Sequence, residues 1–143
     1  MAAPKFGRSA QGKEMHYSVG ALIEKNGKYL LIDRINPPFG FAGIAGHIDE
    51  GENPEQALLR EVEEESGLKV EGYKLLFEEE LDWNWCSKDI GIHHWYLFAC
   101  DVSGETKRDY SEAKSMDWYH PHEIKQLKLE PVWEYWFKKL KLL

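Results

Sequence analysis

Apolar side chains become dense after residue 16, and their spacing there is that of β-strands. Two apolar runs, residues 17–23 and 29–32, flank the dipeptide Asn26-Gly27. Asn-Gly is a preferred sequence for the tight turn between two antiparallel strands. These residues therefore predict a β-hairpin. Residues 1–14 are small, basic and polar, and we expect them to form a flexible N-terminal tail.

The second half of the chain combines strand-like and helix-like patterns. Residues 68–81 alternate weakly and predict one strand or a bent pair, whereas residues 92–102 carry bulky side chains on both faces, as in a central strand buried on both sides. Residues 116–119 predict a short strand, residues 120–124 a short helix, and residues 131–142 an amphipathic terminal helix. This mixture predicts an α/β fold, an α/β/α sandwich around a mixed β-sheet.

Between these two halves the sequence predicts a helix with well-defined ends. Asn53 suits the N-cap, Pro54 suits the first helical position, and Gln56 is placed to complete a capping box with Asn53. Gly67 suits the position that ends the helix. The predicted helix therefore covers residues 54–66.

Three glutamates share one face of this predicted helix. At about 100° per residue, Glu61, Glu64 and Glu65 project in one direction, and Arg60 lies at the edge of that face. Like charges one turn apart destabilise a bare helix by about 0.2–0.5 kcal/mol. A hard divalent cation, Mg²⁺ or Mn²⁺, would explain the cluster, because such ions prefer oxygen ligands. A solvated acidic face is the alternative explanation.

The segment that contains this helix resembles the Nudix box, G-x5-E-x7-R-E-U-x-E-E-x-G-U, where U is aliphatic. All nine defined positions match at the required spacing: Gly46, Glu52, Arg60, Glu61, Val62, Glu64, Glu65, Gly67 and Leu68. The flanking order of strands and helices extends the similarity to nearly the whole chain. The resemblance implies the Nudix fold, with residues 15–143 as a single Nudix hydrolase domain.

The resemblance also implies a metal site. Glu61, Glu64 and Glu65 would bind Mg²⁺ or Mn²⁺ together with a backbone carbonyl at or before Gly46, and the preceding residue here is Ala45. Glu61 and Glu64 would also be catalytic. A backbone carbonyl is present whatever the side chain, so alanine can serve at the preceding position.

Two further box residues are implied to orient the glutamates. Arg60 and Glu52 would hold the metal-binding carboxylates in place through ion pairs. We count Arg60 among the catalytic residues, whereas Glu52 would support the metal ligands without binding the metal itself.

A carboxylate outside the box is expected to complete the site. In the resembling family it often comes from the loop between the long central strand and a short strand that bears a tryptophan. Glu112 lies in that loop, six residues before Trp118. We expect Glu112 to bind a second ion or to accept the proton of the attacking water. Glu105 and Asp109 are rivals in the same loop, and a solvated loop charge is the alternative.

Four residues are candidates for substrate contact. Phe41 lies in the loop that leads into the box, and His47 follows its first glycine. Trp83 and Trp85 lie near a predicted loop, where an indole ring could stack on a base. The other histidines have no zinc-protease spacing and are expected to be strand or cap residues.

Composition narrows the cellular setting and the partners. A chain of 143 residues with 43% hydrophobic content suits one domain, as a monomer or homodimer. A net charge of −7 argues against binding duplex nucleic acid or an anionic membrane. Cys86 and Cys100 form no disulfide framework or C-x-x-C motif, and no apolar run approaches about 18 residues. We therefore expect a cytoplasmic protein with a small-molecule nucleotide substrate.

The favoured function is a divalent-metal-dependent pyrophosphohydrolase, in which water cleaves a phosphoanhydride of a nucleoside diphosphate linked to another group. A non-catalytic Nudix module that senses a nucleotide is the alternative, and an acidic protein-interaction domain is a weaker third. The run Glu130-Pro131-Val132 resembles the MutT-like branch of the family, although Leu129 replaces the asparagine expected before it.

Overall fold

A computed structural model of the chain describes residues 3–86 and 89–143. The strands are β1 (Phe6–Arg8), β2 (Glu14–Lys25), β3 (Lys28–Arg34), β4 (Phe41–Ala42), β5 (Ile44–His47), β6 (Lys69–Leu81), β7 (His93–Ser103) and β8 (Ala113–Tyr119), and the helices are α1 (Pro54–Ser66), α2 (Pro121–Ile124) and α3 (Pro131–Lys139). Within the described ranges, none of the helices is long and apolar enough to span a bilayer.

The strands form one mixed eight-stranded sheet whose main path is β4-β3-β2-β7-β6. The central strand β2 runs parallel to β7 and antiparallel to β3 and β5. The predicted hairpin is confirmed: β2 and β3 are joined by Asn26 and Gly27, whose φ angles of 54° and 78° suit the two-residue turn. The predicted strand over residues 92–102 is also confirmed as β7, which lies between β2 and β6.

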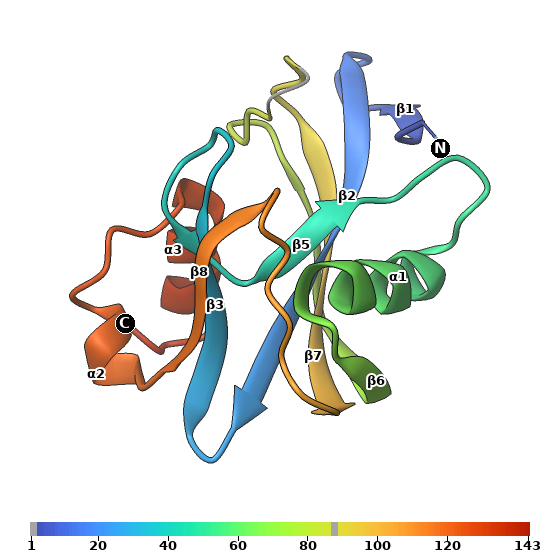
Figure 1. The fold of residues 1–143 in the computed structure, drawn as a ribbon. Coiled ribbons are helices and arrows are strands. Elements are labelled where there is room, and N and C mark those ends of the chain that lie inside the picture. The colour runs from blue at the N-terminus through green and yellow to red at the C-terminus, as the bar shows by residue number, and fades with distance from the viewer. Residues whose placement is uncertain (1–2, 87–88) are drawn as a thin grey trace.

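Each face of the sheet packs against a helix (Figure 1). On one face, Ala57, Leu58 and Val62 of α1 join a core cluster with apolar residues of β2 and β3. On the other face, Trp133 and Trp136 of α3 pack with residues of β3 and β7. The structure therefore confirms the α/β/α sandwich around a mixed sheet.

Helix α1 begins and ends where the sequence predicts. The Asn53 side chain accepts a hydrogen bond from the Gln56 backbone N–H at 2.8 Å, and the Gln56 side chain accepts one from Asn53 N–H at 2.9 Å. Gly67, with a φ of 75°, ends the helix in the left-handed conformation. These caps fix where the glutamates of α1 project.

The N-terminal residues differ from the flexible tail that we expected. Phe6–Arg8 form β1 and pair with β2. The Lys5 N–H donates to the Ile48 carbonyl at 2.8 Å, and the Glu50 N–H donates to the Ala3 carbonyl at 2.8 Å. These long-range backbone hydrogen bonds order the segment, and a local apolar pattern does not reveal them.

Candidate active site

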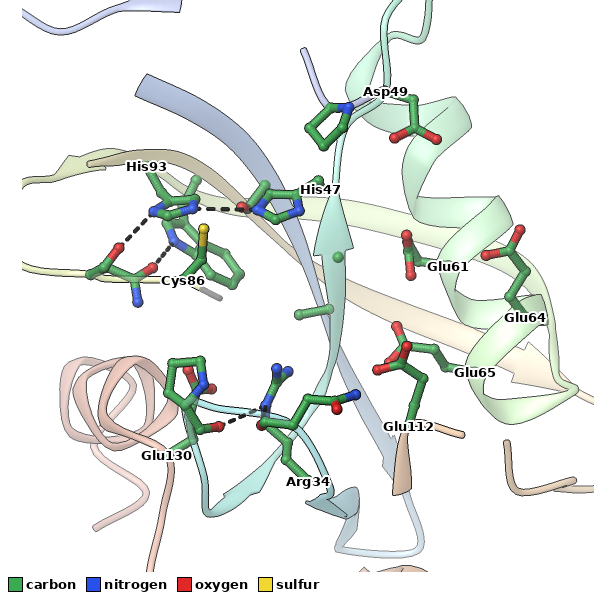
Figure 2. Close-up of a pocket in the computed structure, with 18 of the residues that line it drawn as sticks. Arg34, His47, Asp49, Glu61, Glu64, Glu65, Cys86, His93, Glu112 and Glu130 are labelled. Carbon is green, nitrogen blue, oxygen red and sulfur yellow. Dashed lines mark hydrogen bonds between the residues drawn. The ribbon is translucent and has the colours of Figure 1, made fainter. Parts of the chain in front are cut away.

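A cavity of about 740 Å³ opens where α1, β5 and three loops meet (Figure 2). Its lining includes the end of β3 and the following loop, the box residues of β5 and α1, the segment before β7, the loop before β8, and the residue before α3. The titratable residues among these are Arg34, His47, Asp49, Glu52, Arg60, Glu61, Glu64, Glu65, Cys86, His93, Asp109, Glu112 and Glu130. Residues far apart in the chain therefore share one site.

Four glutamates converge on one side of this cavity (Figure 2). Glu61, Glu64 and Glu65 come from one face of α1, as the sequence predicts, and Glu112 comes from the loop before β8. Their exposure differs, because Glu65 is 7% exposed whereas the Glu64 side chain is 58% exposed. The cluster therefore runs from a buried carboxyl group to one in contact with solvent.

Burial and mutual repulsion perturb the inner pair of carboxyl groups. Burial raises the pKa of Glu65 well above its ordinary value, and the charges of Glu61 and Glu112 raise it further. Burial also raises the pKa of Glu61, although Arg60 opposes the shift. Among the described residues, the buried Oε2 atom of Glu65 has no hydrogen-bond partner. A cation in this place would stabilise the ionised carboxylates and give that oxygen a partner.

Gly46 brings bare backbone against this cluster. A Cβ atom added at Gly46 would overlap the carboxyl group of Glu61, so a larger residue would displace that side chain. Ala45 and Gly46 both line the cavity. The backbone of β5 therefore lies beside the glutamates of α1, and carboxylate and carbonyl oxygens are the ligands that Mg²⁺ or Mn²⁺ prefers.

Arg60 links the box carboxylates to one another. Its Nε and Nη2 atoms donate to the two carboxylate oxygens of Glu52 at 2.7 and 2.8 Å, and its Nη1 donates to Glu61 at 2.7 Å. Nη1 also donates to Glu64 at 3.3 Å, and Nη2 donates to the His47 carbonyl at 3.0 Å. The Arg60 hydrogen bonds hold the pKa of Glu52 below its ordinary value. The predicted ion pairs between Arg60 and these glutamates are present in the structure.

The three acidic candidates of the loop before β8 differ in their positions and contacts. Glu112 lines the cavity and acts electrostatically on Glu65. Asp109 also lines the cavity, but one of its carboxylate oxygens accepts hydrogen bonds from the Ser111 N–H at 2.9 Å and the Ser111 hydroxyl at 2.6 Å. Glu105 lines a separate hollow beside Trp118. Of the three, Glu112 is the one whose charge acts on Glu65, and its role as the additional carboxylate stays a prediction.

Of the three aromatic candidates, only Trp85 lines the cavity. Trp85 lines the cavity, and its Nε1–H donates to Asp89 at 3.1 Å. Trp83 lies outside the cavity lining, with its ring against Tyr135 at a centroid distance of 5.3 Å. Phe41 also lies outside the lining, in β4, where side-chain alternation directs its ring against Tyr119. The positions of Phe41 and Trp83 therefore give no support to substrate contact, whereas that of Trp85 does.

Two charged residues of the cavity that lie outside the Nudix box, Arg34 and Glu130, were not predicted from the sequence. Arg34 ends β3, and its Nε donates to the Pro38 carbonyl at 2.8 Å. Glu130 precedes α3, and burial raises the pKa of its carboxyl group to about 7, an effect that Arg34 opposes. In the sequence, the run that contains Glu130 indicates only a resemblance to the MutT-like branch. Only the folded chain brings these two residues together.

Comparison with known proteins agrees with this geometry. The NUDIX domain family model matches residues 14–140, and the chain therefore belongs to the Nudix family. A CTP pyrophosphohydrolase of Escherichia coli (strain K12) is 31% identical over 121 residues, which cover 80% of this chain and 82% of that protein. A MutT-like protein of Streptomyces ambofaciens is 31% identical over 75% of this chain and 64% of its own length.

Solved structures show the same fold. A MutT Nudix hydrolase from Burkholderia pseudomallei is similar with a TM-score of 0.64 and 26% identity, covering 78% of this chain and 87% of that chain. The chain spans only 21% to 31% of the length of four other curated relatives that it matches. The family is thus established, and the activity is inferred from the site.

Proposed function

We propose that the protein is a pyrophosphohydrolase that depends on Mg²⁺ or Mn²⁺ and cleaves a phosphoanhydride of a nucleoside diphosphate linked to another group. The convergence of Glu61, Glu64, Glu65 and Glu112 in one cavity is the observation that supports this function. A module that only senses a nucleotide would have no need for this carboxylate cluster, and every defined position of the box is intact.

The metal-binding residues would be Glu61, Glu64 and Glu65, with backbone oxygen at Ala45 or Gly46. When bound, the cation supplies positive charge that offsets the charge on the phosphate oxygens and on the leaving phosphate. Arg60 keeps the carboxylates in place through the hydrogen bonds described above.

The remaining chemistry belongs to the protein's own side chains. We infer that Glu112, on a different segment from the box glutamates, accepts the proton of the attacking water at a carboxylate oxygen or holds a second cation. As the new P–O bond forms, the bond between phosphorus and the bridging oxygen breaks, and the leaving phosphate keeps that electron pair. Arg34 adds a positive charge to the same cavity.

Relatives and cavity size support a nucleotide substrate. The names of two relatives state CTP and ADP-ribose. A cavity of about 740 Å³ lies within the roughly 300–1,000 Å³ range of small-molecule sites. Because the chain carries a net charge of −7, we infer that cations within the site, rather than the protein surface, attract the phosphates.

Metal dependence tests the proposed function directly. With a panel of nucleoside triphosphates, nucleotide sugars and ADP-ribose, we expect hydrolysis in Mg²⁺ or Mn²⁺ that excess EDTA abolishes and added metal restores. Chromatography of the products identifies the bond that is cut. Undiminished hydrolysis in excess EDTA would contradict the proposal. Nucleotide binding without turnover of any panel member would instead support the sensing module.

The two exposed tryptophans provide a matched test of base stacking. Trp83 and Trp85 are 46% and 45% exposed, but only Trp85 lines the cavity. Trp85→Ala should raise KM by the equivalent of about 1–3 kcal/mol, the usual contribution of a base stacked on an aromatic ring, with kcat nearly unchanged. Trp83→Ala should leave both parameters at their parental values. Equal KM values in the two variants would exclude this role for Trp85.

A further inference from the structure

Three histidines and one cysteine meet on the side of the cavity away from the glutamates. They are His16, His47 and His93, at the ends of neighbouring strands, and Cys86, from the segment before β7. One side-chain nitrogen or sulfur atom of each lies within 4.8 Å of the other three. Figure 2 shows His47, His93 and Cys86 gathered apart from Glu61 and the other box carboxylates.

Strand pairing explains why the three imidazole rings share one face. His16 of β2 pairs with His93 of β7 in the parallel register, so both side chains project to the same side of the sheet. Ser18 lies two residues after His16 and therefore on that same face, and it pairs with His47 of β5. Three adjacent strands thus direct imidazole rings toward one point, and Cys86 approaches from a loop.

Two of the distances between these ligand atoms are close to those of a tetrahedral metal site. Zinc binds imidazole nitrogen at about 2.0–2.1 Å and thiolate sulfur at about 2.3 Å, so ligand atoms around one ion lie about 3.3 Å (N···N) and about 3.6 Å (N···S) apart. In the structure, His47 Nε2 and His93 Nε2 are 3.4 Å apart. Cys86 Sγ and His16 Nδ1 are 3.9 Å apart. Shifts of a few tenths of an ångström would bring these two pairs to ligand spacing.

A supporting hydrogen bond orients one of the rings. The Nδ1 atom of His93 lies 2.6 Å from the Asn84 carbonyl oxygen, which only accepts, so Nδ1 carries the proton. The Nε2 atom of the neutral ring therefore carries the lone pair, and it lies within hydrogen-bond distance of His47 Nε2, at 3.4 Å. The Asn84 side chain is itself fixed, because Trp95 Nε1–H donates to its Oδ1 at 2.7 Å. Histidine ligands of metals are commonly held in this way, with the other ring nitrogen donating to a carbonyl or carboxylate.

We propose that His16, His47, Cys86 and His93 form a zinc site, separate from the carboxylate site for Mg²⁺ or Mn²⁺. Three imidazoles and a thiolate suit Zn²⁺, whereas Mg²⁺ requires oxygen ligands. Four protein ligands leave no open position, which is the arrangement of structural zinc. The Cys86 thiol releases its proton to solvent on binding. Bound zinc would connect β2, β5 and β7 to the segment before β7.

Ordinary packing of aromatic rings is the competing explanation for the cluster. The His16 ring lies edge-on to the rings of Phe6 and His47, at centroid distances of 4.6 and 4.7 Å, and the His47 ring stacks on that of His93. Packing alone requires no thiol and predicts no selective affinity for a thiophilic metal. Metal binding that depends on Cys86 distinguishes the two explanations.

The experiment titrates the chelator-treated protein with Co²⁺ and with Zn²⁺. Co²⁺ should give the visible bands of tetrahedral cobalt and a near-ultraviolet charge-transfer band from thiolate, and Zn²⁺ should displace it at one ion per chain. Cys86→Ser should lose the charge-transfer band and bind Zn²⁺ at least about tenfold more weakly, since loss of even a supporting hydrogen bond commonly costs about 10- to 100-fold. Zinc should raise Tm in the parent and not in this variant.

Three control variants separate the zinc site from other metal-binding groups. Cys100→Ala removes the only other cysteine of the chain, which is buried in the core, and His122→Gln removes an exposed ring that lies beside His120. Both should keep the charge-transfer band and the zinc affinity. Glu64→Gln should also keep them, although it alters the carboxylate site, so failure of the hydrolase proposal would leave this result unaffected.

A Co²⁺ spectrum without the thiolate band, or equal zinc affinity in Cys86→Ser and the parent, would overturn the zinc site. If Cys86→Ser does not fold, His47→Gln replaces it, because His47 is only partly buried. That variant should lose the tetrahedral cobalt bands, and its retention of them would equally overturn the proposal.

Discussion

Replacing Glu64 with glutamine is expected to lower kcat by roughly 10²- to 10³-fold, because it removes a charge that acts on the phosphates more strongly in the transition state than in the ground state. Glu64 is the most suitable box glutamate for this test. Its side chain is 58% exposed, whereas Glu61 is only partly exposed and Glu65 is buried, so the substitution should leave the packing of α1 intact. Steady-state kinetics at saturating Mg²⁺ measures the effect.

Helix α1 offers a closely matched control. Glu63 is the preceding residue, is exposed, and lies outside the cavity lining, so Glu63→Gln makes the same change of charge away from the site. It should retain the parental kcat, and both variants should melt near the parental temperature. Arg60 keeps its hydrogen bonds to Glu52 and Glu61 in either variant. Equal activity of Glu64→Gln and Glu63→Gln would remove Glu64 from catalysis.

The sequence predicts well those parts of the fold that depend on interactions between residues close together in the chain. The Asn26-Gly27 turn depends on two adjacent residues, and the ends of α1 depend on Asn53, Gln56 and Gly67. The grouping of the α1 glutamates follows from helical geometry alone. These interactions form between residues close in the chain, so their pattern is visible before any tertiary structure is known.

The features that were missed depend on contacts between distant segments. β1 is held by pairing with β2 and by backbone hydrogen bonds to the loop after β5, and residues 3–8 carry no strong apolar alternation of their own. The meeting of His16, His47, Cys86 and His93 requires the register of three strands. The sequence shows four separate residues there, without a metal-ligand spacing.

The course of the chain after β6 determines the different positions of Trp83 and Trp85. Trp83 and Trp85 are two residues apart near a predicted loop, and the sequence does not distinguish which of the two rings faces the substrate. The fold directs Trp83 onto Tyr135 of α3 and Trp85 to the cavity. The Nudix box thus locates the carboxylates of α1. The surface that faces the substrate depends on loops outside the box, and the box does not specify their course.

Glu112→Gln is expected to lower kcat at least about tenfold, about 1.4 kcal/mol of transition-state stabilisation, while the melting temperature without metal stays at the parental value or rises. Glu112 lines the cavity, and its charge raises the pKa of buried Glu65, so the two carboxyl groups interact in the folded protein. Removing the charge of Glu112 relieves that repulsion. A loss of kcat without a loss of stability would therefore indicate a role in the reaction.

The two rival carboxylates of the same loop serve as controls for Glu112. Glu105→Gln should retain the parental kcat, because Glu105 faces a separate hollow. Asp109→Asn should have a smaller effect than Glu112→Gln on kcat, because Ser111 already occupies one Asp109 oxygen with two hydrogen bonds. Parental kcat in Glu112→Gln at saturating Mg²⁺ would exclude Glu112 from the mechanism, and a large loss in Asp109→Asn instead would transfer the role to Asp109. The Mg²⁺ dependence of kcat in Glu112→Gln distinguishes the two proposed roles of Glu112. If Glu112 accepts the proton, the decrease in kcat should persist at any Mg²⁺ concentration. If Glu112 binds a second ion, the decrease should become smaller as the Mg²⁺ concentration is raised.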